Sequence, residues 1–294
     1  MLIIVYHIIL LRKWRFLSLE KFFTQKFFTH FLQEKDRLMT DISDNIYHET
    51  RKEEGRQEIT MSEKLKEKDV LKASEQITYK EILKNEEINA MIEQGNNVLK
   101  CLGYTEHSKK HAAKVAEHAA EILKMTGSDE HEIELAKIAG YMHDIGNCIN
   151  RQDHAHSGAI LAYSILKQLN MPLKDCLTIT TAIGHHDEKT GTALEPVSAA
   201  LILADKTDVR RNRVQNPVIA NFDIHDRVNY AVLNSSLEFK TEKKIIQMNL
   251  ELDDSMCTVM DYFGIFLERM MMCRRAAEVL GWRFKLVANG SKLC

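Results

Sequence analysis

Between about residue 85 and residue 215, the hydrophobic side chains recur at steps of three and four residues, the period of an α-helix. The first two runs consist of His111, Val115, Ala119 and Ile122, and of Ile133, Ala136, Gly140 and His143. In each run a histidine shares the hydrophobic face, which turns its ring toward the interior of the fold. We therefore expect two helices that each carry an inward-facing histidine, the second of which Gly146 would stop.

Three further helices are predicted in the same part of the chain. Asp153 is a suitable N-cap for the third helix, and Asn170 with Pro172 ends it. Gly158 lies on the inner face of this helix and would let another backbone approach closely. The fourth helix ends in "TAIGHHDE", and the fifth begins at Pro196.

The C-terminal residues 241–294 follow a different pattern. "KKIIQMNLEL" alternates hydrophobic and polar residues like a strand, "DYFGIFLERMMMCRRAAEVL" reads as a helix that Gly281 would stop, and "WRFKLVAN" alternates again. Two strands that flank a helix predict a small sheet packed on the helical body. Only 3 prolines and 12 glycines occur, which also favours a mostly helical fold. The expected fold is an all-α core, residues 81–240, with a small β-containing appendage.

The first 80 residues divide into two segments. Residues 1–40 are apolar and basic, and residues 41–80 form a charged linker, with regular structure resuming near Tyr79. The run "MLIIVYHIILL" is too short to span a bilayer, and its positive charges follow it rather than precede it as in a secretory signal. Residues 1–32 fit a helix on a membrane surface. The alternatives are a helix covering the protein, or an extension upstream of a start at Met39 or Met61.

Composition and charge limit the classes of function. The net charge is −2, so no global positive field indicates nucleic acid as a partner. The six cysteines lie far apart and form no C-x-x-C pair, which is typical of reduced thiols in a cytoplasmic protein.

Ionisable residues occur at the inward faces or ends of all five predicted helices. They are His111, His143 with Asp144, His154, His185 with His186, and Asp205. One such residue would be an ordinary core residue, but five helices that each deliver one indicate convergence on a cation. Imidazole and carboxylate ligands without a thiolate suit Mn²⁺, Fe²⁺ or Zn²⁺. We expect one or two divalent ions, with Mn²⁺ or Fe²⁺ favoured over Zn²⁺ or Mg²⁺.

The order of these residues resembles the HD-domain metal-dependent phosphohydrolases, whose motifs run H…HD…D on an all-helical core. His111 in "HAAKVA" matches the first histidine, His143 and Asp144 the HD pair, and Asp205 in "ILADKTD" the last aspartate. The resemblance covers about residues 85–215 and identifies residues 81–240 as the HD domain. One metal would take His111, His143, Asp144 and Asp205. In the dinuclear branch a second would take Asp144, His154 (with His156 the rival), His185 and His186.

Two departures separate the chain from the branch that cleaves cyclic dinucleotides. Asn147 stands where that branch has a lysine, and "DEKTGTALEP" lacks its Gly-Tyr-Pro triplet. The resemblance implies hydrolysis of a phosphate monoester or phosphodiester, of nucleotide type, by metal-activated water held by Asp144. Two alternatives stay open: a regulatory or scaffold protein whose metal site senses or stabilises, and a di-iron oxygenase.

A basic segment, "DKTDVRRNR", follows the last predicted ligand. Lys206, Arg210, Arg211 and Arg213 are candidates for binding the phosphate of the substrate. Asp208 would orient one of these cations or carry a proton, and we class Asp208 and Lys206 with Asp144 as catalytic candidates. The competing interpretation is a solvated helix face on which Asp208 pairs with an arginine. The expected partner is a phosphorylated small molecule or nucleotide, and the C-terminal region is a candidate dimer interface.

Overall fold

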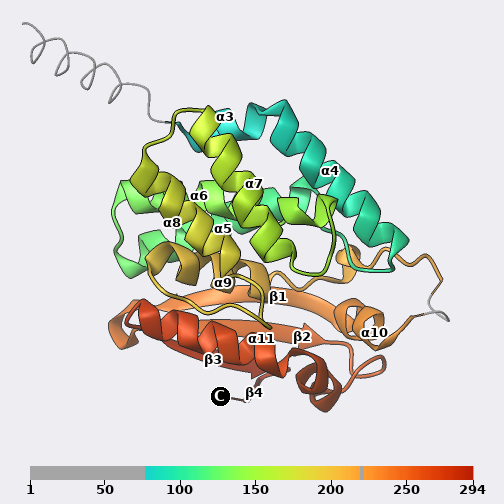
Figure 1. Cartoon of the computed structure of the whole chain (residues 1–294). Helices are drawn as coiled ribbons and strands as arrows, with labels where there is room; N and C mark the ends of the chain where they lie inside the picture. The colour runs from blue at the N-terminus through green and yellow to red at the C-terminus, as the bar shows by residue number, and fades with distance from the viewer. Residues whose placement is uncertain (1–76, 219–221, 294) are drawn as a thin grey trace, which may run out of the picture. The chain divides into compact units, whose positions relative to one another are not determined.

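The computed structural model describes residues 77–218 and 222–293 (Figure 1). The N-terminal segment 1–40, most of the linker 41–80 and the membrane-surface interpretation of residues 1–32 lie outside the described residues. The described residues all belong to one compact unit, residues 75–294. Within it the helices α3 to α9 stack on one side of a small sheet, which the C-terminal half supplies (Figure 1).

The helical body consists of α3 (Tyr79–Lys84), α4 (Glu86–Cys101), α5 (Lys109–Thr126), α6 (Glu130–Met142), α7 (His154–Gln168), α8 (Leu173–Gly184) and α9 (Pro196–Thr207), with a 3₁₀ turn η1 (Ile145–Cys148) after α6. Side chains cap α4, α5, α6 and α9, because Asn85, Ser108, Asp129 and Glu195 each accept a backbone N–H of the first turn. Gly127, with φ of 92°, ends α5 in the left-handed conformation. The five helices predicted for this region are all present.

Two close backbone contacts set the spacing of these helices. A Cβ on Gly140 would lie 2.7 Å from Cα of Ala116, so α6 touches the backbone of α5 at this point. A Cβ on Gly158 would lie 3.2 Å from the backbone N of Gly146, as the prediction of a close approach required. Glycine thus brings α5, α6, η1 and α7 together near the end of α6.

The structure corrects the roles predicted for two residues. Gly146 does not stop α6 by adopting a positive φ; instead, a Cβ there would lie 2.0 Å from the carbonyl O of His154. Asp153 precedes α7, but its φ is 57° and its side chain caps nothing. Both corrections have one cause: the turn from η1 into α7 is shaped by close packing rather than by capping.

The C-terminal half contains η2 (Arg211–Arg213), α10 (Ile224–Ala231), β1 (Val232–Lys240), η4 (Thr241–Lys243), β2 (Ile245–Leu252), α11 (Val259–Val279), β3 (Arg283–Ala288) and β4 (Ser291–Lys292). The strands form a sheet in the order β1-β2-β3-β4. β2 and β3 pair in parallel through α11, and β1 and β4 pair antiparallel to their neighbours. Gly281, with φ of 71°, follows α11 as expected.

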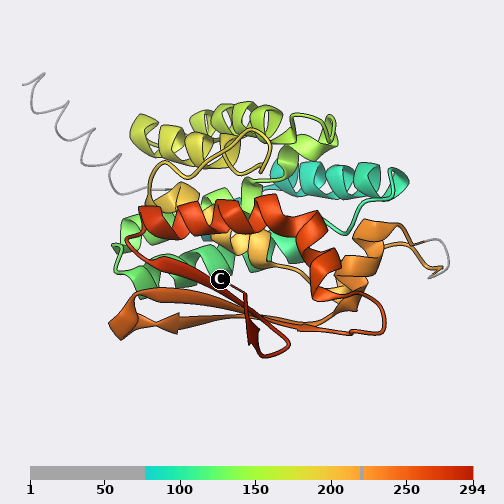
Figure 2. The ribbon, with the colours of Figure 1, turned by 90° about the horizontal axis from the view of Figure 1, so that it is seen from below.

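The predicted fold, a helical core with a small C-terminal sheet, is confirmed. The strand β1 was not predicted, and it joins residues before 240 to the sheet of the appendage. Helix α11 lies along one face of the sheet (Figure 2) and packs against α9 as well as β3. The C-terminal region therefore contacts the helix that carries Asp205. The predicted domain ranges and a dimer interface at the C-terminal region stay predictions.

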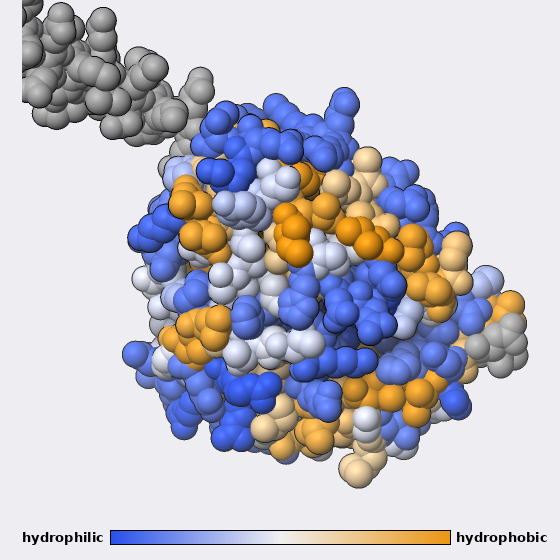
Figure 3. Space-filling view, in the orientation of Figure 1, coloured by the Kyte–Doolittle hydropathy of each residue, from blue (hydrophilic) through white to orange (hydrophobic). Residues whose placement is uncertain are grey.

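The surface seen in Figure 3 is largely hydrophilic, with hydrophobic residues in separate patches. The exposed hydrophobic side chains include Ile160, Leu173 and Met260, at 71%, 52% and 78% exposure. Among the described residues, no helix combines the length and the apolar character needed to cross a membrane.

Candidate metal centre

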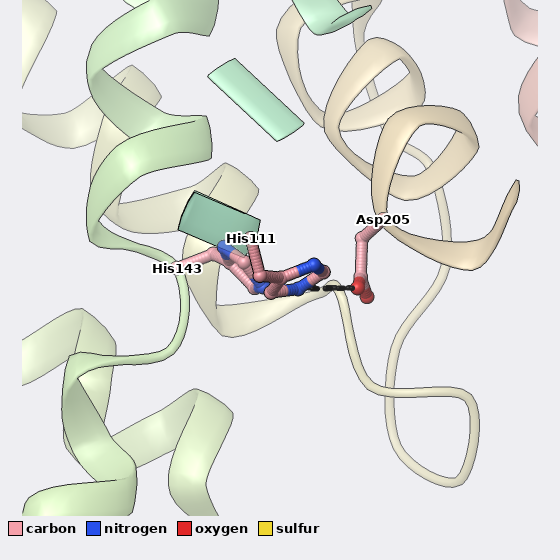
Figure 4. Close-up of side chains that lie close together, drawn as sticks. All are labelled: His111, His143 and Asp205. Atoms are coloured by element: carbon pink, nitrogen blue, oxygen red, sulfur yellow. Dashed lines mark ion pairs between the residues drawn. The ribbon is translucent and has the colours of Figure 1, made fainter. Parts of the chain in front are cut away.

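Three helices bring the first histidine, the HD pair and the last aspartate together. His111 comes from α5, His143 follows the last turn of α6, and Asp205 belongs to α9; their side chains point toward one another (Figure 4). Asp205 Oδ1 lies 3.4 Å from Nε2 of His111 and 3.7 Å from Nε2 of His143. Both imidazoles are fully buried. These three residues form a group whose ligand atoms could hold one cation.

Asp144 lies between two sets of imidazoles. Its Oδ2 is 3.1 Å from Nε2 of His143 and 3.9 Å from Nε2 of His111. Its Oδ1 is 3.4 Å from Nε2 of His154 and 3.8 Å from Nε2 of His186. Nε2 of His154 and Nε2 of His186 are 3.1 Å apart. Each carboxylate oxygen therefore faces its own set of nitrogens, which is the arrangement a carboxylate bridging two cations requires.

The histidines share one orientation, because in each ring Nδ1 is occupied and Nε2 turns to the centre. The Nδ1 partners are Asp208 Oδ2 for His111, and the carbonyls of Gly140, Arg151 and Ile183 for His143, His154 and His186. A ring that donates through Nδ1 keeps the lone pair of Nε2 free for a metal. Three of these bonds go to the carbonyl three residues earlier, so local backbone geometry fixes the tautomer.

Electrostatics put the carboxylates in the charged form that a metal needs. Burial alone would raise the pKa of Asp144, but attraction to His143 and His107 outweighs it and holds this pKa well below its usual range. Burial likewise opposes ionisation of Asp205, yet Lys206 and His111 keep its pKa low. Burial and repulsion from His186 lower the pKa of His154 to about 3, so this imidazole is neutral. Ionised carboxylates and neutral imidazoles are the metal-binding forms.

The residues fit a bound cation. Nε2 of His111 and Nε2 of His143 are buried and have no hydrogen-bond partner among the described residues. A buried polar atom without a partner costs about 1–3 kcal/mol, and coordination would remove that penalty. The two carboxylates also raise the pKa of His143 although burial lowers it, which shows that the site attracts positive charge.

Three of the histidines proposed as ligands, His154, His156 and His185, differ in their burial. His154 is buried in the centre, whereas its rival His156 is exposed, so the structure favours the first of these alternatives. The two tightest groups of candidate ligands, His111–His143–Asp205 and His143–Asp144–His186, contain neither His185 nor His154. His185 is half-buried, and its buried Nδ1 has no hydrogen-bond partner among the described residues. Of these two adjacent histidines, His185 and His186, His186 is the one whose Nε2 lies near Asp144 and His154.

Asp208 holds His111 in place rather than orienting Lys206. Its Oδ2 lies 2.8 Å from Nδ1 of His111, and its Oδ1 lies 2.8 Å from Nζ of Lys114. Nε and Nη2 of Arg210 donate to both of its oxygens. The pairing of Asp208 with an arginine, one of the two interpretations of this segment, is thus present. Because Asp208 is fully buried, this bond fixes the ring of a candidate ligand.

The three arginines predicted to bind phosphate all have protein partners. Arg210 pairs with Asp208, Arg211 donates to the carbonyl of Tyr230 and pairs with Asp253, and Arg213 donates to the carbonyls of Glu106 and Asp208. Lys206 differs, because its Nζ lies 2.8 Å from Asp205 Oδ2 and 2.8 Å from Glu188 Oε2. Burial disfavours its charge, but the two carboxylates raise its pKa, so it stays an ammonium beside a candidate ligand.

Sequence reasoning missed three residues at the centre. His107 Nε2 lies 3.9 Å from Asp144 Oδ2, and its place one turn before His111 on the same face was the available signal. Nδ2 of Asn147 donates to Asp144 Oδ1 at 2.7 Å, and Nη1 of Arg151 lies 3.4 Å from Nε2 of His154. Nothing in the local pattern pointed to Arg151, because the preceding loop sets its direction.

Replacing Asp208 by asparagine is expected to weaken metal binding by about 10- to 100-fold, because the amide no longer fixes the tautomer of His111. Competition with a chromogenic chelator measures this affinity. The matched control is Asp175→Asn, which alters another buried carboxylate paired with a histidine, His131, at 2.9 Å. Equal metal affinity in the Asp208 variant and the control would exclude this role for Asp208.

Part of the chain is similar to known proteins. Residues 109–212 match the family model of the HD domain. Over 169 residues the chain is 28% identical to the uncharacterized protein MJ1020 of Methanocaldococcus jannaschii, covering 50% of this chain and 65% of that protein. A crystal structure of a predicted HD superfamily hydrolase from an uncultured Thermotogales bacterium is 27% identical, covers 42% of this chain and 67% of its own, and has a TM-score of 0.34.

Residues 109–212 therefore resemble an HD domain in sequence and carry its ordered histidines and aspartates in one buried cluster. The matched segment contains the first histidine, the HD pair, His154, His186 and the last aspartate. The family model thus supports the resemblance found in the sequence, and the His/Asp cluster is consistent with binding of a divalent metal. The match spans just under two thirds of the curated relative's length.

Proposed function

We propose that this protein is a metal-dependent phosphohydrolase that cleaves a phosphate monoester or phosphodiester of a nucleotide-type substrate with a metal-activated water. The position of Asp144 supports this most strongly. Each of its oxygens faces a separate set of imidazole nitrogens, at 3.1–3.9 Å on one side and 3.4–3.8 Å on the other. Two cations joined by one carboxylate are a common arrangement for hydrolysis of phosphate esters.

The residues divide between two candidate metal positions. His111, His143 and Asp205 would hold one ion, and His154 with His186 the other, with Asp144 shared. Divalent ions bound here, Mn²⁺ or Fe²⁺ by preference and Zn²⁺ or Mg²⁺ as alternatives, would lower the pKa of water and neutralise phosphoryl oxygens. The aspartates supply two negative charges to this centre, and the backbone bonds to Nδ1 hold the rings in place.

Two cationic side chains flank the centre. Lys206 lies beside Asp205 on one side, and Arg151 lies beside His154 on the other. Nη1 of Arg151 lies 3.4 Å from Asn147 Oδ1 and 3.4 Å from Nε2 of His154. Both contacts are long, so the protein binds this guanidinium only weakly. Both groups would stabilise the negative charge on the phosphoryl oxygens of the substrate. Asp208 acts through His111 as a positioning residue.

The protein would act in the cytoplasm. All five cysteines among the described residues are free, which fits a reducing compartment. The phosphorylated substrate would be the partner of the site.

Metal-loaded protein is expected to release phosphate, or a nucleotide product, from at least one compound of a panel of nucleotides and phosphodiesters. The panel is assayed with Mn²⁺, Fe²⁺, Zn²⁺ and Mg²⁺ separately, and metal atoms per chain are counted by elemental analysis. The matched control is protein treated with chelator and then dialysed, which should lose turnover and regain it when metal returns. Tight metal binding without turnover of any compound would contradict the proposal and favour a sensing role.

A further inference from the structure

The arginines of the segment that follows Asp205 have their donors directed to the protein. Three N–H groups of Arg210 reach Asp208 and Asn212, and those of Arg211 and Arg213 reach backbone carbonyls and carboxylates. A guanidinium that binds substrate needs free donors on the side of the site. Each of these three arginines therefore directs at least two of its five N–H groups to protein partners.

Arg269 of helix α11 directs fewer of its N–H groups to the protein. Its Nη2 lies 3.3 Å from Glu188 Oε1, and this is its one hydrogen bond to a described residue. Its Nε is buried and has no hydrogen-bond partner among the described residues. Four of the five N–H groups of a guanidinium thus stay available. The side chain is 24% exposed, and its guanidinium carbon lies 4.6 Å from the centroid of the Phe266 ring.

A short chain of ionic contacts connects Arg269 to the metal centre. Glu188 uses its second oxygen, Oε2, to bind Nζ of Lys206 at 2.8 Å, and Lys206 binds Asp205 Oδ2 at the same distance. Asp205 turns its other oxygen to His111. Arg269 is therefore linked to Asp205 through Glu188 and Lys206.

The charges of this group favour an anion. Lys206 and Arg269 are opposed by Glu188 and Asp205, and the charge of Asp205 would be engaged by a coordinated cation. Glu188 then remains as the one counter-charge for two cations, which leaves one positive charge in excess. The hydroxyl of Tyr262, two turns before Arg269 on the same helix, is also buried and has no hydrogen-bond partner in the described part of the chain.

We propose that Arg269 binds a second, non-reacting phosphate of the substrate, with Lys206 shared between this phosphate and the reacting one, so that the substrate is a nucleotide carrying at least two adjacent phosphate groups. This inference rests on the proposed function, since the first phosphate occupies the metal centre. It gives the C-terminal helix α11 a role in substrate recognition. Arg269, the side chain that would distinguish a diphosphate from a monophosphate, lies outside the segment that matches the HD domain, residues 109–212. Glu188 competes with the anion for both cations.

Two non-hydrolysable probes, methylphosphonate and methylenediphosphonate, test this proposal in the metal-loaded full-length protein by calorimetry. We expect methylenediphosphonate to bind more tightly than methylphosphonate. The Arg269→Gln variant should bind methylenediphosphonate about tenfold more weakly and methylphosphonate unchanged, because one charge-assisted contact is lost. Arg274→Gln is the matched control on the same helix, since Arg274 is exposed and pairs with Glu278. Metal content is measured after each titration, because the diphosphonate also chelates.

A second variant distinguishes binding of the anion from a purely structural role of the Arg269–Glu188 ion pair, which joins α11 to the loop that carries Glu188. Glu188→Gln removes the competing carboxylate, so methylenediphosphonate should bind more tightly than in the wild type. If the ion pair were purely structural, both the Glu188 and the Arg269 variants would bind methylenediphosphonate more weakly, and that result would overturn the proposal. So would equal affinity for the two probes, or an Arg269 variant that binds both as the wild type does.

The outcome is independent of the test of the phosphohydrolase activity. Loss of diphosphonate affinity in Arg269→Gln, in a protein that turns over no compound of the panel, would support the anion site and contradict the proposed function. Turnover of a monophosphate with no effect of Arg269 on diphosphonate binding would support the function and overturn this inference.

Discussion

The Asp144→Asn variant is expected to lose hydrolysis of a phosphoester by about a thousandfold or more, because several kcal/mol of charge stabilisation by the metal ions disappear. The amide keeps one oxygen and places an NH₂ group where the other oxygen faced a set of imidazoles. One candidate metal position therefore loses its bridging ligand, and the centre loses one negative charge. We expect elemental analysis to find fewer metal atoms per chain than in the wild type.

A matched control for this variant lies nearby. Asp153→Asn also replaces a carboxylate by an amide, and asparagine tolerates the left-handed conformation at φ of 57°. Asp153 is exposed and its side chain caps nothing, so kcat/KM and metal content should match the wild type. If Asp144→Asn keeps both the metal and the turnover of the control, Asp144 does not bridge two ions.

Local periodicity accounts for most of the centre that could be predicted. His111, His143 and His154 lie on inward helical faces, which a step of three or four residues reveals without any knowledge of tertiary contacts. His186 and His185 show the limit of this reasoning. Both stand at the end of α8, and the direction of the chain after the last helical turn decides which one faces the metal site.

Contacts between distant residues could not be predicted from the pattern. Asp208 binds His111 across 97 positions, and Arg269 meets Glu188 across 81. The strand β1 is a similar case: "VLNSSLEFK" carries three adjacent polar residues, and its pairing with β2 stabilises it as a strand. A charged side chain near a predicted ligand can therefore belong to the substrate site or to the scaffold, and the tertiary fold alone distinguishes the two.

The Gly146→Ala variant is expected to lower the free energy of unfolding by about 3 kcal/mol, because its added methyl group overpacks a contact between backbones. A Cβ at this position would lie 2.0 Å from the carbonyl O of His154 and 2.5 Å from the backbone N of Gly158. Neither atom can rotate away as a side chain could. The turn η1 and helix α7 would have to separate, which moves Asp144 away from His154. Urea unfolding of the metal-free protein measures the change.

Gly264→Ala provides the matched control with the opposite sign. Gly264 lies within α11, it is exposed, and a Cβ there meets nothing within 4 Å. Alanine should stabilise this helix by up to about 1 kcal/mol, since glycine loses more backbone entropy on folding. The Gly146 variant should also bind metal more weakly, whereas the Gly264 variant should bind it as the wild type does. Equal stability of the two variants would mean that η1 and α7 are not in backbone contact, and the position of His154 beside Asp144 would then need another explanation.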